Sequence, residues 1–391
     1  MTLSSTQSED FPLFRLGFRP FFLVAALGSV VLLCLWLLSW SNVMPVTNYF
    51  SSINWHAHEM LFGYTTAVIA GFLLTAVRNW TGIDTPTGMP LMIITLTWLI
   101  ARILPLIPQV PGWLVSITDL AFLPLIAIAL VRPLWLGKNK VNRIFLLLIA
   151  AMFIANMMVH AEALGFAHLA SNGLTLMTDM IILLILIITG RVLPFFTQAV
   201  IPGFTAKQWV WVEKPTILLM IFIAALHQLP TQAWLLSITY FLLAGLQIIR
   251  VSGWHNPRVW KIPVLWVLYT GYAWLIVGFA LSALSAANLF AANLATHALT
   301  IGVIGIFTLG MMSRVALGHT ARPMQTSSSV NLAFILLNLS AVARVFGPVI
   351  LPSQYIVWIY LSGSIWILAF LLFAIQYIPI LLSPRVDGKP G

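Results

Sequence analysis

The stretch NWHAHEMLFGYTTAVIAGFLLTAV, residues 54–77, decides the fold class, because it is long and apolar enough to cross a bilayer as a helix. Its first turns nevertheless carry two histidines and a glutamate, His56, His58 and Glu59. An ionisable group within a bilayer costs roughly 2.5 to 3.5 kcal/mol, so such groups usually face a cavity, a partner or a metal. The stretch therefore predicts a transmembrane helix that carries a functional site near its start.

Similar apolar runs recur along the whole chain. Of its 391 residues, 61% are hydrophobic and only 7% are charged, and the mean hydropathy is +1.01. We therefore expect an all-α polytopic membrane protein with about twelve transmembrane helices. The expected spans are 20–40, 54–77, 88–108, 112–132, 143–164, 172–191, 214–230, 233–252, 262–285, 290–313, 329–351 and 355–382.

These runs leave no room for a sizeable soluble domain, so residues 1–391 are expected to form a single transmembrane domain. The first run follows Arg15 and Arg19 without a small-residue cleavage site, which predicts a retained helix rather than a signal peptide. The lone cysteine, Cys34, excludes an intrachain disulfide and a thiolate cluster.

The basic residues gather on one side of the predicted membrane. With twelve spans, every Lys and Arg except Arg102 and Arg344 falls on that side. The residues on that side are Arg15, Arg19, Arg78, Arg132, Lys138, Lys140, Arg143, Arg191, Lys207, Lys214, Arg250, Arg258, Lys261, Arg314, Arg322, Arg385 and Lys389. This bias predicts cytoplasmic N and C termini, and it explains the net charge of +10 without a nucleic-acid partner.

Most of the histidines fall in the opposite, outer half of the membrane. These are His56, His58, His160, His168, His227 and His297. The other two, His255 and His319, are expected in cytoplasmic loops, and we expect His319 to tolerate replacement. A single buried histidine is ordinarily a hydrogen-bonded structural residue. Several at one depth on different helices indicate a cavity or a metal centre instead.

An internal match relates two of these histidines. His58, Gly63, Gly71 and Thr81 recur at one constant offset as His297, Gly302, Gly310 and Thr320. Weaker echoes elsewhere predict three four-helix units, residues 14–132, 143–252 and 262–382. The glycines alone have a second explanation, close packing of helices.

Facing imidazoles in a helical bundle are typical of haem iron, and copper takes imidazole ligands as well. Residues two apart on a helix point about 200° apart, so His56 and His58 are expected to serve two different centres. We expect His58 and His297 to be the principal ligands of a haem b. His56 and His160 are then the candidates for a second metal or its immediate surroundings, and His227 is a further candidate metal ligand.

An acidic residue lies next to each histidine cluster. Glu59 and Glu162 are candidate catalytic groups, because a carboxylate orients a ligand imidazole or relays protons. The alternative is that they form ion pairs with Arg102 or Arg344, the two arginines near the outer side. These two arginines are also candidate contacts to a bound cofactor.

Several motifs together resemble the NnrS family, over nearly the whole chain. They are FRLGFRPFF (14–22), WHAHEMLFGY with AGFLLTAV and NWTG (55–82), GRVLPFFTQ (190–198), PVLWVLYTGYAW (263–274), and THALTIGVIG with RVALGHTAR (296–322). The resemblance implies a twelve-span bacterial inner-membrane protein with haem and copper, linked to nitric oxide, denitrification and protection against nitrosative stress. His58, His160, His297 and His319 match histidine positions of the family, whereas Tyr269 stands where members often have histidine.

Two classes of function follow from these residues. The first is a redox enzyme that binds and reduces nitric oxide at a haem and a second metal, with electrons from quinol or another donor in the membrane lipid. The second is a non-catalytic protein that binds or moves haem, copper or an iron nitrosyl species. The chain lacks the adjacent histidine pair of the haem-copper oxidases, so it is not an ordinary member of that superfamily.

Overall fold

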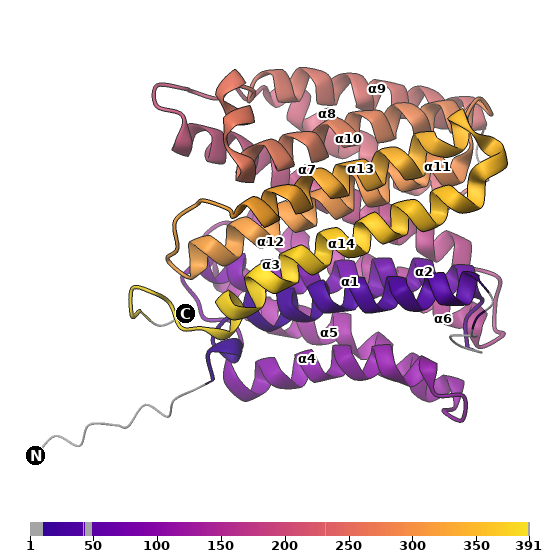
Figure 1. The fold of residues 1–391 in the computed structure, drawn as a ribbon, viewed down its shortest axis with the longest axis horizontal. Coiled ribbons are helices and arrows are strands. Elements are labelled where there is room, and N and C mark those ends of the chain that lie inside the picture. Colours follow the sequence, from indigo (N-terminus) through magenta and orange to yellow (C-terminus); the bar gives the residue numbers. More distant parts are fainter. Residues whose placement is uncertain (1–10, 42, 44–48, 231, 390–391) are drawn as a thin grey trace, which may run out of the picture.

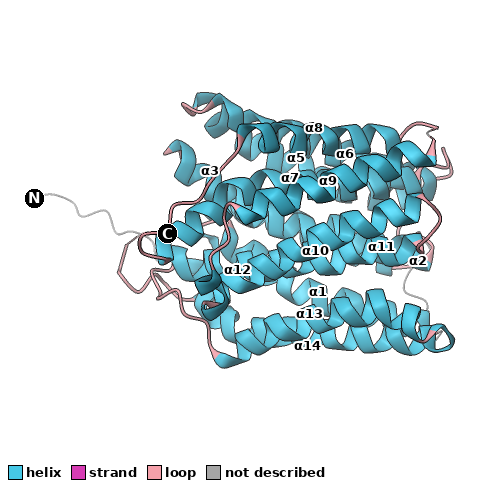
Figure 2. Ribbon diagram, turned by 90° about the horizontal axis from the view of Figure 1, so that it is seen from above, coloured by secondary structure: helices cyan, strands magenta, loops and turns pink. Residues whose placement is uncertain are grey.

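The helices that the apolar runs predict are present and form one bundle (Figure 1). The computed structural model describes residues 11–41, 43, 49–230 and 232–389, and these contain helices and loops but no strand (Figure 2). In this part of the chain, 12 helices are long and apolar enough to cross a membrane. The expected multi-pass, all-α fold is therefore confirmed.

Most spans are built on one continuous α-helix, which satisfies its backbone polar groups within hydrocarbon by its own hydrogen bonds. These helices are α1 (Phe18–Trp40), α4 (Gly88–Ile103), α5 (Gly112–Leu136), α6 (Ile144–Ala163), α7 (Ala170–Val200), α8 (Val210–His227), α9 (Ala233–Ser252), α10 (Pro263–Ala286), α13 (Ser328–Ile350) and α14 (Tyr355–Leu382). Short 3-10 turns lie at several ends, at η1 (Pro12–Phe14), η3 (Leu104–Leu106), η4 (Lys140–Arg143), η5 (Pro257–Lys261) and η7 (Pro352–Gln354).

Two spans change helix type part of the way along. The second runs as α2 (Ser52–His58), the π-helical segment η2 (Glu59–Thr65) and α3 (Thr66–Thr81). The tenth runs as α11 (Ala292–His297), the π-helical segment η6 (Ala298–Gly305) and α12 (Ile306–His319). In both, the π segment begins directly after the matched histidine, His58 or His297. The internal sequence match thus has a structural counterpart, of a kind often found at functional sites.

Some helix ends lie beyond the predicted ones. The sixth span continues to Val200, so the loop expected over 192–213 is shorter than predicted. Pro194 lies inside this helix, where its ring removes one backbone hydrogen bond. His319, expected in a loop, is the last residue of α12, and its ring lies 5.7 Å from that of Phe18.

The first and last spans lie side by side, and α13 packs along α14 (Figure 1). At the start of α1, the guanidinium of Arg19 donates to the carbonyl oxygens of Leu381 at 2.9 Å and Ser383 at 2.7 Å. The start of the first span and the end of the last therefore meet at one end of the bundle, as an even number of crossings requires.

Two matched glycines allow helices to approach closely. A Cβ atom on Gly302 would lie 2.7 Å from the ring of Trp274, and one on Gly71 would lie 2.9 Å from the ring of Phe22. Neither position has room for a larger side chain. Close packing therefore accounts for these glycines, while the histidines of the same match need a separate explanation.

Candidate metal and cofactor sites

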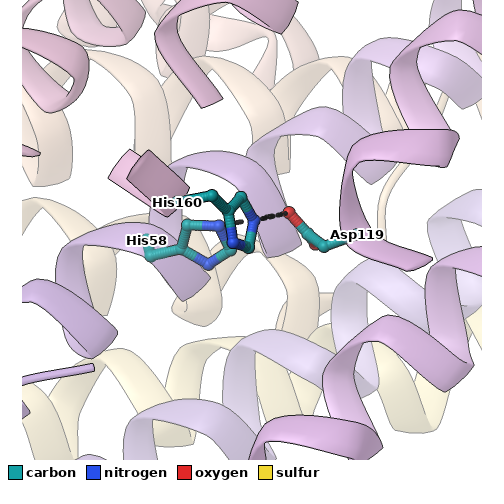
Figure 3. Close-up of side chains that lie close together, drawn as sticks. All are labelled: His58, Asp119 and His160. Carbon is teal, nitrogen blue, oxygen red and sulfur yellow. Dashed lines mark hydrogen bonds and ion pairs between the residues drawn. The ribbon is translucent and has the colours of Figure 1, made fainter. Parts of the chain in front are cut away.

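A buried cluster joins His58, Asp119 and His160, from α2, α5 and α6 (Figure 3). Their relative exposures are 1%, 3% and 1%, and their tips point toward one another. Oδ2 of Asp119 lies 3.2 Å from Nε2 of His58 and 2.9 Å from Nε2 of His160. These three ligand atoms all lie within 4.8 Å of one another, which is close enough to hold a metal ion.

The other ring nitrogen of each histidine is held by a neighbouring group. Nδ1 of His58 lies 3.2 Å from Oε1 of Glu59, and Nδ1 of His160 lies 2.9 Å from the hydroxyl of Tyr49. Burial raises the pKa of Tyr49 to about 12, so this hydroxyl keeps its proton. A protonated hydroxyl both donates and accepts, so the contact fits either tautomer of His160.

The amide of Asn156 completes the cluster. Its Nδ2 donates to Oδ2 of Asp119 across 2.7 Å, which turns its Oδ1 toward Nε2 of His58 at 3.1 Å. His58 therefore faces oxygen atoms at both ring nitrogens, since Glu59 lies on its other side. Each ring nitrogen therefore needs a proton, carried by the ring or by the facing carboxyl group, or a cation in place of the inner proton.

Arg102 pairs with both carboxylates of the cluster. Its Nη1 donates to Oε2 of Glu59 across 3.0 Å, and its Nη2 pairs with Oδ1 of Asp119. The ion pair considered above as the alternative for Glu59 is thus formed. Two carboxylates and one guanidinium leave one net negative charge away from water, which a proton on His58 or a metal cation offsets.

Glu162 and Arg344 do not belong to this cluster. A carboxylate oxygen of Glu162 accepts the backbone N–H of Ala170 across 2.8 Å, at the start of α7. Nη2 of Arg344 donates to the hydroxyl of Tyr355 across 3.2 Å. Glu162 therefore caps a helix, and no ion pair joins it to an arginine in the described part of the chain.

A second site lies in a cavity of about 770 Å³ between helices from both halves of the chain. Sites for small molecules and cofactors typically measure ~300–1,000 Å³, with apolar walls and a few polar groups. The walls here include Trp36 and Trp366. Three histidines and one arginine also line the cavity, namely His56, His227, His297 and Arg344.

His297 and His56 each present a nitrogen that can bind a ligand. Nδ1 of His297 lies 2.6 Å from the carbonyl oxygen of Asn293, which only accepts, so Nδ1 carries the proton and Nε2 keeps its lone pair. The ring of His56 stacks on Trp36 with 4.0 Å between ring centroids. Its Nδ1 is buried and has no hydrogen-bond partner among the described residues. A buried polar atom of this kind costs ~1–3 kcal/mol unless a ligand satisfies it.

His227 has both ring nitrogens engaged at another part of the cavity wall. Its Nδ1 donates to Oδ2 of Asp179 across 2.7 Å, and the hydroxyl of Tyr240 donates to its Nε2 across 3.3 Å. Asp179 and Tyr240 are buried, and all three side chains line the cavity. The arrangement can hold and pass on a proton, because its middle member accepts at one nitrogen and donates at the other.

The structure groups the predicted residues differently from the sequence interpretation. His56 and His58 lie in different sites, as their spacing predicts. His297, however, shares the cavity with His56, whereas His58 and His160 share the buried cluster. The residues expected to be the two principal haem ligands, His58 and His297, thus line separate sites.

Two acids of these sites, Asp119 and Asp179, are absent from the sequence interpretation. Both stand inside predicted spans, at 112–132 and 172–191. A carboxylate within an apolar run marks a functional site on the same grounds as a histidine does. The sequence therefore contained the signal for both, although not for their partners.

Comparison with known families supports the resemblance. The sequence model of the family described as NnrS protein matches residues 12–385, nearly the whole chain. No curated protein matches the chain. All the residues of the buried cluster and of the cavity lie within the matched range.

Proposed function

The chain belongs to the NnrS family, and from this premise we propose that it binds nitric oxide at a haem b in the cavity. Membership of this family fits a nitric-oxide-related membrane protein, and the 12 candidate spans make the chain a multi-pass one. We propose the bacterial inner membrane as its location and copper as its second cofactor. The observation that carries the haem proposal is the presence of His56 and His297 in one largely apolar cavity.

The donor atoms in the cavity fit a haem. Nε2 of His297 would bind iron, because the carbonyl of Asn293 holds the ring in the required tautomer. The unpartnered Nδ1 of His56 supplies a second ligand atom. Nη1 of Arg344 is also buried without a hydrogen-bond partner among the described residues, and a guanidinium suits a haem propionate.

Haem iron, when bound, supplies the position at which nitric oxide coordinates. The chain itself supplies the surroundings, a largely apolar wall that includes Trp36 and Trp366. Asp179, His227 and Tyr240 hold a proton at the cavity wall. Reduction of two nitric oxide molecules to nitrous oxide and water consumes two electrons and two protons. We propose that quinol in the membrane lipid supplies the electrons.

The alternative is a carrier that binds haem, copper or an iron nitrosyl species without turnover. The two cavity histidines favour it in one respect, because imidazoles that both held the iron would compete with nitric oxide for it. In a carrier, the same histidines would release their ligand along a path through the bundle.

Optical spectroscopy and gas analysis of purified, detergent-solubilised protein test the proposal. Reduced protein is mixed with excess nitric oxide and a quinol, and nitric oxide and nitrous oxide are measured over time. We expect haem absorption and the formation of many equivalents of nitrous oxide per chain. Binding of one equivalent without further consumption would favour the carrier, and purified protein without haem would refute the haem site itself.

A further inference from the structure

We propose that His58, Asp119 and His160 bind one transition-metal ion within the bundle, separately from the haem cavity. The proposal goes beyond the haem site, because it assigns a second site from its own donor atoms. It therefore holds or fails independently of haem in the cavity.

The spacing of the three donor atoms matches a metal site. Ligand atoms ~2.0–2.2 Å from a metal lie ~2.9–3.5 Å from one another in octahedral or tetrahedral geometry. Oδ2 of Asp119 lies 3.2 Å from Nε2 of His58 and 2.9 Å from Nε2 of His160. The carboxylate oxygen thus already lies at coordination spacing from both nitrogens, and the three donor atoms all lie within 4.8 Å of one another.

The hydrogen-bond partners of the two Nδ1 atoms also match a metal site. A metal-binding imidazole usually donates its second N–H to a carboxylate or another oxygen, which fixes the ring orientation. Nδ1 of His58 faces Oε1 of Glu59 at 3.2 Å, and Nδ1 of His160 faces the hydroxyl of Tyr49 at 2.9 Å. Both rings are therefore held with Nε2 toward Asp119, although they come from different helices.

Charge favours a cation at the same point. Glu59 and Asp119 carry two negative charges, and Arg102 offsets only one of them. A proton on His58 would neutralise the remaining negative charge. The competing explanation is therefore an ion-pair network without metal, and the experiment must distinguish this network from a metal site. Two imidazoles and one carboxylate suit copper, iron or zinc, whereas calcium and magnesium require a set of oxygen ligands.

Metal reconstitution provides the test. Purified protein in detergent is treated with a chelator, titrated with copper(II) or zinc(II), desalted and analysed for bound metal per chain. We expect one ion per chain at this site, and electron-spin spectra of the copper form with couplings from two imidazole nitrogens. Asp119→Asn and His160→Gln should bind that ion at least ~10-fold more weakly, because changes around a metal typically cost 10–100-fold in affinity.

The matched control is Asp179→Asn, which changes a buried acid that also contacts a histidine but lies at the cavity. This variant should keep the full metal content. Haem absorption measured on the same samples reports on folding and on the haem site, so each proposal can fail without the other.

Wild-type protein that takes up no ion would overturn the proposal, as would Asp119→Asn protein that binds the ion with unchanged affinity. If the variants fail to fold, the nitrogen couplings of the wild-type copper form decide. Two couplings support the site, and four or none refute it.

Discussion

His56 and His58 are separated by one residue on the same helix, and their rings lie in different sites. The ring of His56 stacks on Trp36 in the cavity, whereas Nε2 of His58 lies 3.2 Å from Oδ2 of Asp119 in the buried cluster. Because positions two apart on a helix point about 200° apart, one helix serves both sites. The two sites can therefore be altered one at a time.

Replacing the cavity histidines should affect haem, and replacing His58 should not. His56→Ala and His297→Ala each remove a proposed iron ligand, so we expect loss of haem or a change from low spin to high spin. His58→Ala should keep the haem spectrum and lose the second metal. Optical and electron-spin spectra of the purified variants measure both properties.

The control for this series is His168→Ala, because His168 is an exposed histidine in the loop between α6 and α7. Its haem and metal contents should match the wild type. If His58→Ala loses haem while His56→Ala keeps it, the pairing of His58 with His297 expected from the sequence is right and the cavity assignment is wrong.

Arg102 should be important for stability. Arg102→Gln leaves Glu59 and Asp119 buried without their counter-charge, and removal of one partner of a buried ion pair typically costs about 3–5 kcal/mol. We expect a lower free energy of unfolding, measured by denaturant titration in detergent. The double variant Arg102→Gln with Glu59→Gln should recover part of the loss. A loss below about 1 kcal/mol in the single variant would contradict this account.

The sequence predicted the fold well because each span is a long apolar run with few charges. It placed the helix ends less well where polar residues or prolines continue a helix, as at Pro194 and at His319. A span that is predicted from its apolar residues ends where the run of apolar residues ends. The helix itself continues past that point, because its backbone hydrogen bonds do not depend on apolar side chains.

The sites were predicted only in part, for a physical reason. Helix geometry separates His56 from His58, because that relationship is local. The partners of His58 come from α5 and α6, and only helix packing brings Asp119 and His160 to it. That His297 and His56 line one cavity likewise depends on the packing of the whole bundle, which no local pattern encodes.

Both chain termini should lie in the cytoplasm. The interhelical loops on that side carry basic residues, including Lys138, Lys207 and Arg258, and the even number of spans returns the chain to the same side. Fusions of an enzyme that is active only in the periplasm, and of one active only in the cytoplasm, to the C terminus measure this. Activity of the periplasmic reporter would reverse the orientation and move the histidines to the inner half.

Tyr49 should make the protein less stable at high pH. Burial raises its pKa from about 10 to about 12, so between these values the unfolded chain releases a proton that the folded chain keeps. The stability present below pH 10 is therefore progressively lost as the pH rises toward 12. Tyr49→Phe should lose less stability than the wild type between pH 9 and pH 11, measured by denaturant titration at both values. Equal losses in the two proteins would contradict the assignment.

Asp179 should matter for turnover and not for binding of nitric oxide. Its carboxylate accepts from Nδ1 of His227 across 2.7 Å, and this fixes the tautomer in which Nε2 of His227 accepts from Tyr240. Asp179→Asn removes the negative charge that stabilises a protonated His227, so the group at the cavity wall can no longer accept and return a proton. General acid–base groups typically contribute 10²–10⁴-fold, so we expect nitrous oxide formation to fall by about 10²-fold or more. The haem spectrum and the binding of one equivalent of nitric oxide should remain, and Tyr240→Phe should have a smaller effect in the same direction. Wild-type turnover in Asp179→Asn would show that protons reach the cavity by another path.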